Sequence, residues 1–206
     1  MITLHHCAGA RSFRALWMLE EMGLPYELRL MAFPPRAREA GYLELNPLGT
    51  VPAFFEDGAL MTESAAICEY LAARHGPTPL AVAPDEEGFA AYLNFLHMGE
   101  ATLTFPQTVY LRYARFEPEE RRIPQAAADY MQWFFSRLKG AAKLLGDQDH
   151  VAAGRFTAAD ISVAYALKLA DFLGFADSFP EPFARYFARM QAREGYQRAL
   201  AAETSR

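Results

Sequence analysis

The chain has 206 residues, of which 52% are hydrophobic and 22% charged, and this composition is typical of a globular protein with a sizeable core. Its net charge of -5 argues against nucleic acid as the main partner, because binding to phosphates needs a basic face. Two cysteines, Cys7 and Cys68, are too few for a disulfide framework, and no apolar run approaches the ~20 residues that cross a bilayer. The N-terminus lacks the pattern of a secretory signal, so we expect a cytoplasmic protein with no membrane partner.

The first 76 residues predict a small α/β domain. Gly23 is a natural helix terminator, and Asp57-Gly58 is a strong hairpin signal. The order of elements is βαβα followed by ββα, so a helix joins the first two strands and a hairpin joins the last two. The expected strands are 2–6, 24–31, 53–56 and 60–62, and the expected helices are 13–22, 37–45 and 64–74.

The rest of the chain predicts an all-α domain over residues 87–206. Residues 77–86, PTPLAVAPDE, are rich in proline and lack periodicity, which indicates a linker. Pro106 should kink or interrupt the first long helix, and Thr157 with Asp160 resembles a capping box. The expected helices are 87–116, 124–145, 158–173, 182–193 and 196–203.

Motifs for metals and phosphates are missing from the sequence. The five histidines show neither HxxxH nor HxH spacing, and there is no CxxC pair. Phosphate-binding glycine loops of the GxGxxG and GxxxxGK types are also missing. We therefore expect no metal cofactor.

Three phrases give the chain its strongest resemblance. They are NPLGTVPAF at 46–54, TESAAICEYLA at 62–72 and TAADISVA at 157–164. In this order and spacing they are similar to the cytosolic glutathione S-transferases of bacterial type, and the resemblance covers essentially the whole chain. It implies an N-terminal thioredoxin-like domain followed by an all-helical domain. It also implies glutathione as co-substrate, a role in detoxification and a homodimer.

Two pairs of residues match the family's glutathione site. Pro52 would be a cis proline, and Val51 before it would present its backbone N–H and C=O to the cysteinyl unit of glutathione. Glu63 and Ser64 would hold the γ-glutamyl group at the positive end of a helix. The alternatives are a trans proline at the start of an edge strand, and plain capping of the helix by residues 62–64.

A basic side chain usually meets the glycine carboxylate of glutathione in this family. Arg36 and Arg38 are the two candidates, because both precede the NP pair at Asn46-Pro47. The alternative for each is a solvated surface arginine. The sequence does not choose between them.

The family activates the glutathione thiol with a Tyr, Ser or Cys near the first helix, which enriches the nucleophilic thiolate. The positions that match this residue hold Gly9 and Arg11, so the usual side chain is missing. Ser12, Arg11 and Cys7 are the remaining candidates, as hydrogen-bond donor, cation and disulfide-forming thiol respectively. Their alternatives are a helix cap, a surface arginine and a small buried hydrophobe. Backbone N–H groups of residues 10–12 could also stabilise the thiolate.

A pocket for a hydrophobic electrophile would lie on the long helix of the second domain. Met98, Phe105, Tyr110 and Tyr113 are candidates for its wall, and the alternative for all four is ordinary helix packing. Glu100 could face the site or a partner subunit, or lie on a solvated helix face.

The resemblance favours conjugation of the glutathione thiolate to an electrophile. A glutathione-dependent disulfide or peroxide reductase is a second reading, which the missing hydroxyl favours. A third reading is a binding or chaperone module that keeps the fold without catalysis.

Overall fold

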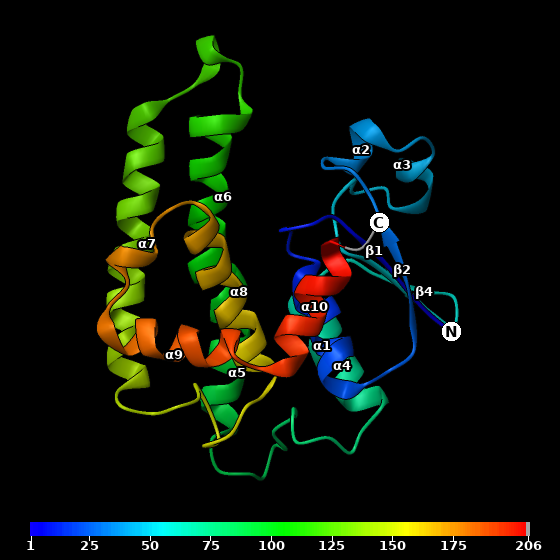
Figure 1. Ribbon diagram of the computed structural model, residues 1–206, viewed down its shortest axis with the longest axis vertical. Coiled ribbons are helices and arrows are strands. Elements are labelled where there is room, and N and C mark those ends of the chain that lie inside the picture. The colour runs from blue at the N-terminus through cyan, green and yellow to red at the C-terminus, as the bar shows by residue number, and fades with distance from the viewer. Residues whose placement is uncertain (205–206) are drawn as a thin grey trace. The chain divides into compact units, whose positions relative to one another are not determined.

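A computed structural model describes residues 1–204 of the protein, and these residues form two compact units (Figure 1). The first unit comprises Met1–Ala81 together with the C-terminal segment that begins at Gln191. The second unit comprises Val82–Met190. The division after Ala81 falls inside the segment expected as a linker.

The first unit contains a four-stranded sheet in the order β2-β1-β3-β4. β1 and β2 are parallel, whereas β1 with β3 and β3 with β4 are antiparallel, as the expected order of strands requires. The strands are β1 (Ile2–His6), β2 (Tyr26–Leu30), β3 (Ala53–Glu56) and β4 (Ala59–Met61). The thioredoxin-like α/β fold predicted for this part is confirmed.

The register of the strands brings three chain segments to one end of the sheet. In the antiparallel pair β1–β3, His5 lies opposite Ala53, so the residue after β1 and the residues before β3 leave the sheet together. In the hairpin β3–β4, Phe54 lies opposite Met61, so the end of β4 also reaches this end. The segments that follow β1 and β4, and the segment that precedes β3, therefore meet at this end of the sheet.

Helices of the first unit differ from expectation at one place. The single helix expected at 37–45 is two short helices, because Glu39 is extended and Gly41 takes a left-handed φ of 75° between them. α1 packs against both α4 and α10 (Figure 1). The helices are α1 (Phe13–Met22), α2 (Pro35–Arg38), α3 (Tyr42–Leu45), α4 (Ser64–Arg74) and α10 (Glu194–Thr204).

α10 belongs to the first unit, although the sequence pattern placed it with the all-α part. The ring of Tyr196 on α10 meets Phe13 and Trp17 of α1 edge-on, with centroid distances of 5.4 and 5.0 Å. A short amphipathic helix shows which face is apolar but not which surface that face will cover. Which helix α10 packs against is therefore seen only in the folded structure.

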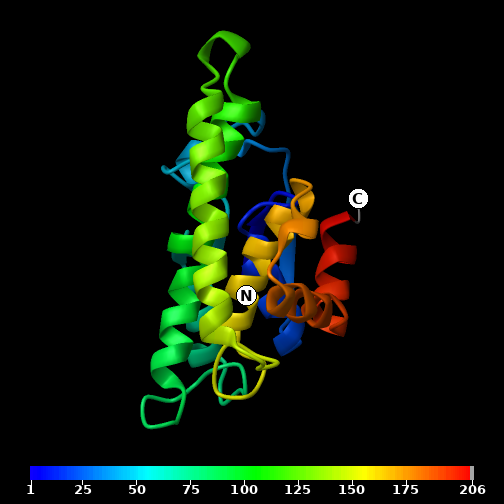
Figure 2. The ribbon, with the colours of Figure 1, turned by 90° about the vertical axis from the view of Figure 1, so that its left-hand side faces the viewer.

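The second unit is all-helical, as predicted. α6 and α7 lie side by side, and Figure 2 shows α7 in yellow-green running along the green helices that precede it. α8 packs against α5 and is buried on nearly all sides, so it is the core of this unit. The helices are α5 (Phe89–Met98), α6 (Phe105–Leu111), α7 (Pro124–Leu145), α8 (Ala158–Phe172) and α9 (Glu181–Gln191).

The interruption predicted at Pro106 is confirmed. A π-helical segment, Gly99–Thr104, separates α5 from α6, and Pro106 lies in the first turn of α6. Proline offers no N–H to the preceding turn, so the regular bonding cannot continue through it. The buried Thr104 hydroxyl donates to the Gly99 carbonyl at 2.7 Å, so a side chain also bonds to the backbone of this segment.

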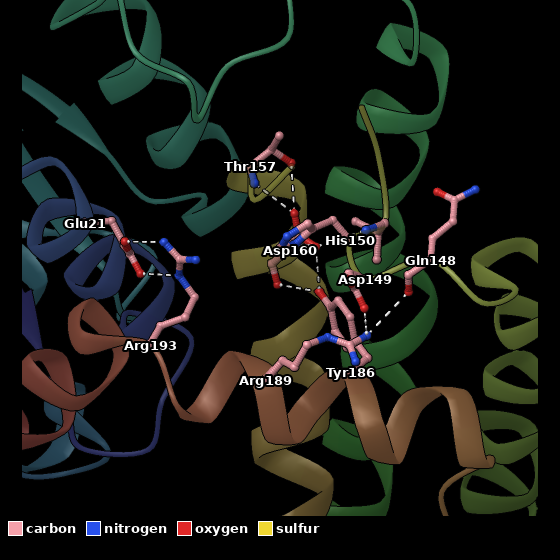
Figure 3. Close-up of polar contacts among 10 residues, drawn as sticks. Glu21, Gln148, Asp149, His150, Thr157, Asp160, Tyr186, Arg189 and Arg193 are labelled. Atoms are coloured by element: carbon pink, nitrogen blue, oxygen red, sulfur yellow. Dashed lines mark hydrogen bonds and ion pairs between the residues drawn. The ribbon is translucent and has the colours of Figure 1, made fainter. Parts of the chain in front are cut away.

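The predicted capping box of α8 is also present. Thr157 N–H donates to Asp160 Oδ2 at 2.8 Å, and the Thr157 side chain accepts from the third helical residue in return (Figure 3). The buried Asp160 carboxylate also accepts from Val151 N–H at 3.0 Å and from the Tyr186 hydroxyl at 3.1 Å. Among the described residues, no helix is long and apolar enough to cross a membrane.

Candidate functional site

The peptide bond between Val51 and Pro52 is cis, which confirms the prediction. Val51 is buried in a small apolar cluster with Cys7, Tyr42 and Ala53, directly before β3. Within residues 1–204, its backbone N–H and C=O have no hydrogen-bond partner. Buried backbone groups are nearly always paired, so Val51 offers an unused donor and acceptor to a ligand in extended conformation.

The residues before Val51 are held by a buried polar arrangement. The Tyr42 hydroxyl and the Asn46 amide both donate to the Thr50 carbonyl, at 2.6 and 2.8 Å. Asn46 also accepts from Leu48 N–H at 3.1 Å through its side-chain oxygen. These bonds fix the turn 46–50 and so fix Val51. The sequence analysis named Asn46 only as part of the NP pair and missed Tyr42, because the shared acceptor of these two side chains is a backbone atom.

Glu63 and Ser64 lie where α4 begins, as predicted. Glu63 is the residue before the helix, its side chain is exposed, and it makes no capping hydrogen bond. No ion pair or hydrogen bond to its carboxylate is found in the described part of the chain. The first turn of a helix has unpaired N–H groups and a positive dipole end. This position therefore presents a free carboxylate beside an anion-binding helix terminus.

Arg14 is a member of this site that the sequence analysis did not identify. It lies on α1, is fully buried, and donates from Nη1 to Ser64 Oγ at 3.1 Å. Because the hydroxyl oxygen already accepts from Arg14, its hydrogen can point outward as a donor. The buried guanidinium also adds positive charge close to the start of α4. A lone arginine at helical spacing gives no sign of this contact, which joins residues 50 positions apart.

The two candidate arginines differ in position. Arg36 and Arg38 both lie on α2 with exposed side chains. The Cβ of Arg36 lies so close to Gly49 that a Cβ at residue 49 would be only 3.0 Å away, and Gly49 has a left-handed φ of 63°. Arg36 therefore lies next to Gly49, two residues before Val51 in the chain.

Cys7 and Ser12 are fully buried in the loop 7–12, which we call the β1–α1 loop. Burial, with a smaller contribution from the Glu39 carboxylate, raises the pKa of the Cys7 thiol to about 11. A thiol with such a pKa is protonated and unreactive at neutral pH. The Ser12 hydroxyl accepts from Cys7 N–H at 3.4 Å inside the loop. Both side chains are therefore buried within the fold, as the alternative for Cys7 expected.

Arg11 is the one candidate of this loop with a half-exposed side chain. It lies two residues before α1 begins, and its carbonyl accepts from Arg14 N–H at 3.1 Å. Gly9 is exposed and has a left-handed φ of 72°, a conformation that favours glycine. The absence of a side chain at this aligned position therefore suits the backbone of the turn.

In the second unit, the expected wall residues contact different neighbours. Phe105 is half exposed and meets Tyr130 of α7 edge-on at 6.4 Å, whereas Tyr110 meets Phe175 at 5.6 Å. Tyr113 lines a separate cavity of about 330 Å³ near the tip of the α6–α7 hairpin. Met98 and Glu100 are half-buried where α5 passes into the π-helical segment.

The second unit also has a cavity of about 680 Å³ that the sequence did not predict. It lies between the start of α5, the end of α7 and the loop 148–154, and Phe95 and Leu144 are among its walls. Within residues 1–204, no cluster of three or more His, Cys, Asp or Glu side chains could hold a metal ion.

Comparisons with known proteins match this picture. Residues 9–74 match the family model of the glutathione S-transferase N-terminal domain. Glutathione S-transferase GstA of Escherichia coli O157:H7 is 30% identical over 211 residues, covering 97% of this chain and 98% of that protein. Glutathione S-transferase 3 of Schizosaccharomyces pombe is 40% identical over 106 residues, so the chain matches 43% of that protein's length.

Solved structures show the same architecture. A sphingomonad glutathione S-transferase complexed with glutathione has a TM-score of 0.84 and 27% sequence identity to this chain. The alignment covers 98% of each chain.

Proposed function

Because the chain belongs to the glutathione S-transferase family, we propose that it binds glutathione and conjugates its thiolate to a hydrophobic electrophile. One observation carries the proposal. The unpaired backbone of Val51 and the unpaired carboxylate of Glu63 lie at the same end of the β3–β4 hairpin. Glutathione is an extended tripeptide. Its peptide backbone is complementary to that of Val51, and its ammonium group is complementary to the carboxylate of Glu63.

The γ-glutamyl end of glutathione carries an ammonium and a carboxylate. In our proposal the ammonium binds Glu63, and the carboxylate accepts from Ser64 and from the N–H groups of the first turn of α4. Arg14 supports this orientation, because it occupies the acceptor side of the Ser64 hydroxyl. The buried positive charge of Arg14 also favours an anion here.

The cysteinyl unit in the middle would pair with the N–H and C=O of Val51 as a short β-strand addition. The turn held by Tyr42 and Asn46 supports this pairing, because a fixed backbone loses little entropy when a ligand binds. The glycine carboxylate would meet Arg36, whose position beside Gly49 favours it over Arg38.

Activation of the thiol is assigned to Arg11 and to the backbone of the β1–α1 loop. The loop follows β1, whose end lies beside Val51 and hence beside the cysteinyl position. A guanidinium near the sulfur lowers the pKa of a thiol by favouring the thiolate. Burial of Cys7 and Ser12 speaks against direct contact of either side chain with the sulfur.

A reductase acting on disulfides or peroxides is the second candidate function. The observation that favours it is the lack of an exposed hydroxyl or thiol in the β1–α1 loop. A module without catalysis is the third candidate. For the assembled protein we also propose a cytoplasmic homodimer, which sedimentation analysis can check.

Two measurements on wild-type protein test these functions. Calorimetry with glutathione should give a saturable binding isotherm below millimolar concentrations, and its absence would contradict both catalytic functions. Initial rates of conjugation to a chlorodinitrobenzene probe are then compared with rates of glutathione-dependent reduction of hydroxyethyl disulfide. Conjugation should be the faster reaction, and reduction alone would favour the second candidate.

A further inference from the structure

Glu203 stands out as a buried carboxylate in the last turn of α10. Only 6% of its side chain is exposed. A buried carboxylate is costly unless hydrogen bonds or charges compensate it, so its partners are informative.

The partners of Glu203 belong to β1 and the β1–α1 loop. Its Oε2 accepts from the backbone N–H of Gly9 at 2.9 Å, and the same oxygen lies 3.4 Å from Nε2 of His6. His6 is fully buried, and neither ring nitrogen has a hydrogen-bond partner within the described residues. The carboxylate thus reaches the turn that leads from β1 to Arg11, although it is 194 positions away in sequence.

α10 is firmly placed on α1, which fixes the position of Glu203. Arg193 forms a bidentate pair with Glu21 at 2.8 and 2.9 Å (Figure 3). One turn later, Arg198 donates to the Glu20 carboxylate at 3.0 Å and to its carbonyl at 2.7 Å. Gly195 permits this close approach, because a Cβ there would lie 2.5 Å from Glu21 Cδ.

The β1–α1 loop is joined to α1 by backbone bonds at its far end, where the carbonyls of Ala10, Arg11 and Ser12 accept from N–H groups of α1. Ala10 N–H donates to the Cys7 carbonyl at 3.0 Å and closes a turn with Gly9 at its third position. Ser12 Oγ holds Cys7 N–H from the helix side. The Gly9 N–H points out of this turn, and Glu203 is its acceptor. Holding Gly9 therefore sets where the turn, and Arg11 after it, lies.

We propose that Glu203 is a positioning residue for the thiol-activating loop. Its carboxylate holds Gly9 N–H and keeps the loop in the conformation that places Arg11 toward the glutathione sulfur. Glu203 takes no proton and touches no substrate in this role. The functional meaning of the contact rests on the proposed glutathione chemistry, whereas the contact itself does not.

Three full-length variants test the proposal. In Glu203→Ala the acceptor is lost, and kcat for conjugation should fall about tenfold while KM for glutathione stays within about twofold. In Glu203→Gln the side-chain carbonyl still accepts from Gly9, so kcat should recover to within about threefold of wild type. Glu194→Gln changes an exposed carboxylate on the same helix and serves as the control, with wild-type kinetics.

Amide hydrogen exchange of Gly9 gives a readout that does not depend on turnover. Exchange should be at least about tenfold faster in Glu203→Ala than in wild type, and close to wild type in Glu203→Gln and Glu194→Gln. Equal Gly9 exchange in wild type and Glu203→Ala would overturn the proposal. So would a rise in KM with unchanged kcat.

Failure of the proposed function would look different. Wild-type protein would then neither bind nor turn over glutathione, while Gly9 exchange would still decide whether Glu203 holds the loop. If Glu203→Ala does not fold, the comparison of Glu203→Gln with Glu203→Asp decides, because the shorter Asp should lose the Gly9 contact and kcat together. Equal kcat and Gly9 exchange in these two variants would overturn the proposal.

Discussion

Residues 46–64 and the β1–α1 loop meet at the same end of the sheet, but they use their polar groups in different ways. In 46–64, the buried Asn46 side chain is bonded to the backbone of Leu48 and Thr50, whereas the backbone of Val51 and the carboxylate of Glu63 have no partner in the described residues. In the loop, the polar side chain of Ser12 and the N–H of Gly9 are already bonded within the protein. The first segment thus has groups available for the ligand that we propose, whereas the bonded groups of the second fix the backbone of the loop.

This difference explains why glutathione binding is easier to assign than thiol activation. A ligand site can be identified from unpaired groups that surround a common surface. Activation of a thiol depends on small shifts in local charge and on the placement of N–H groups, which a buried hydroxyl or thiol does not reveal. The following changes would sharpen or break the comparison, beginning with the largest expected effect.

Glu63→Gln should weaken glutathione binding most. The substitution removes a charge-assisted bond to the ligand ammonium, so Kd should rise by about 10- to 100-fold. Calorimetry measures the change. Glu69→Gln on the exposed face of the same helix is the control and should bind as wild type. Unchanged affinity in Glu63→Gln would show that the carboxylate does not serve glutathione.

Asn46→Ala should lower stability and binding together. It leaves the Leu48 N–H without its acceptor and the Thr50 carbonyl with one donor fewer, which costs about 1–3 kcal/mol of the free energy of unfolding. Denaturant unfolding measures this cost. Tyr42→Phe removes only the second donor to Thr50 and should cost about 1 kcal/mol. If Tyr42→Phe lowers the free energy of unfolding more than Asn46→Ala does, Asn46 is not the main support of this turn.

Arg36→Ala and Arg38→Ala form a matched pair on α2. Loss of an exposed partner for the glycine carboxylate should raise KM for glutathione about two- to fivefold in Arg36→Ala. Arg38→Ala should leave KM unchanged, since Arg36 is the arginine that packs against Gly49 and is the proposed partner of the carboxylate. The reverse result would assign the carboxylate to Arg38.

Cys7→Ala should have the smallest effect on catalysis, with kcat within about twofold of wild type. The raised pKa of Cys7, about 11, has a separate consequence for stability. Between pH values of about 9 and 11 the folded state keeps the thiol proton that the unfolded chain releases, so the free energy of unfolding falls as pH rises. Denaturant unfolding at pH 8 and pH 10 should show a smaller decrease in Cys7→Ala than in wild type.

Sequence reasoning reached most elements because their ends carry local signals. α4 and α7 begin and end at the expected residues, and both starts are marked, by Glu63-Ser64 and by Pro124. The phrases around Val51-Pro52 also place half of the candidate site. Such signals depend on neighbours in the chain, so no tertiary contact is needed to see them.

The parts that sequence reasoning missed depend on contacts between distant residues. Arg14 is a type of residue that usually lies on the surface, and its role appears only once Ser64 lies beside it. Glu203 lies on α10, whose contact with α1 cannot be known from the pattern of the helix itself. Buried polar side chains are therefore the residues to search for in such sites after the fold is known.

The most direct test of the central claim is a glutathione titration followed by backbone amide NMR. Binding to the proposed site should shift the amide resonances of Val51, Ser64 and Ala65 saturably and together, because these N–H groups lie next to the bound tripeptide. The amide of Glu69, farther along α4, should stay unchanged. Saturable binding that leaves Val51 and Ser64 unshifted would contradict the account.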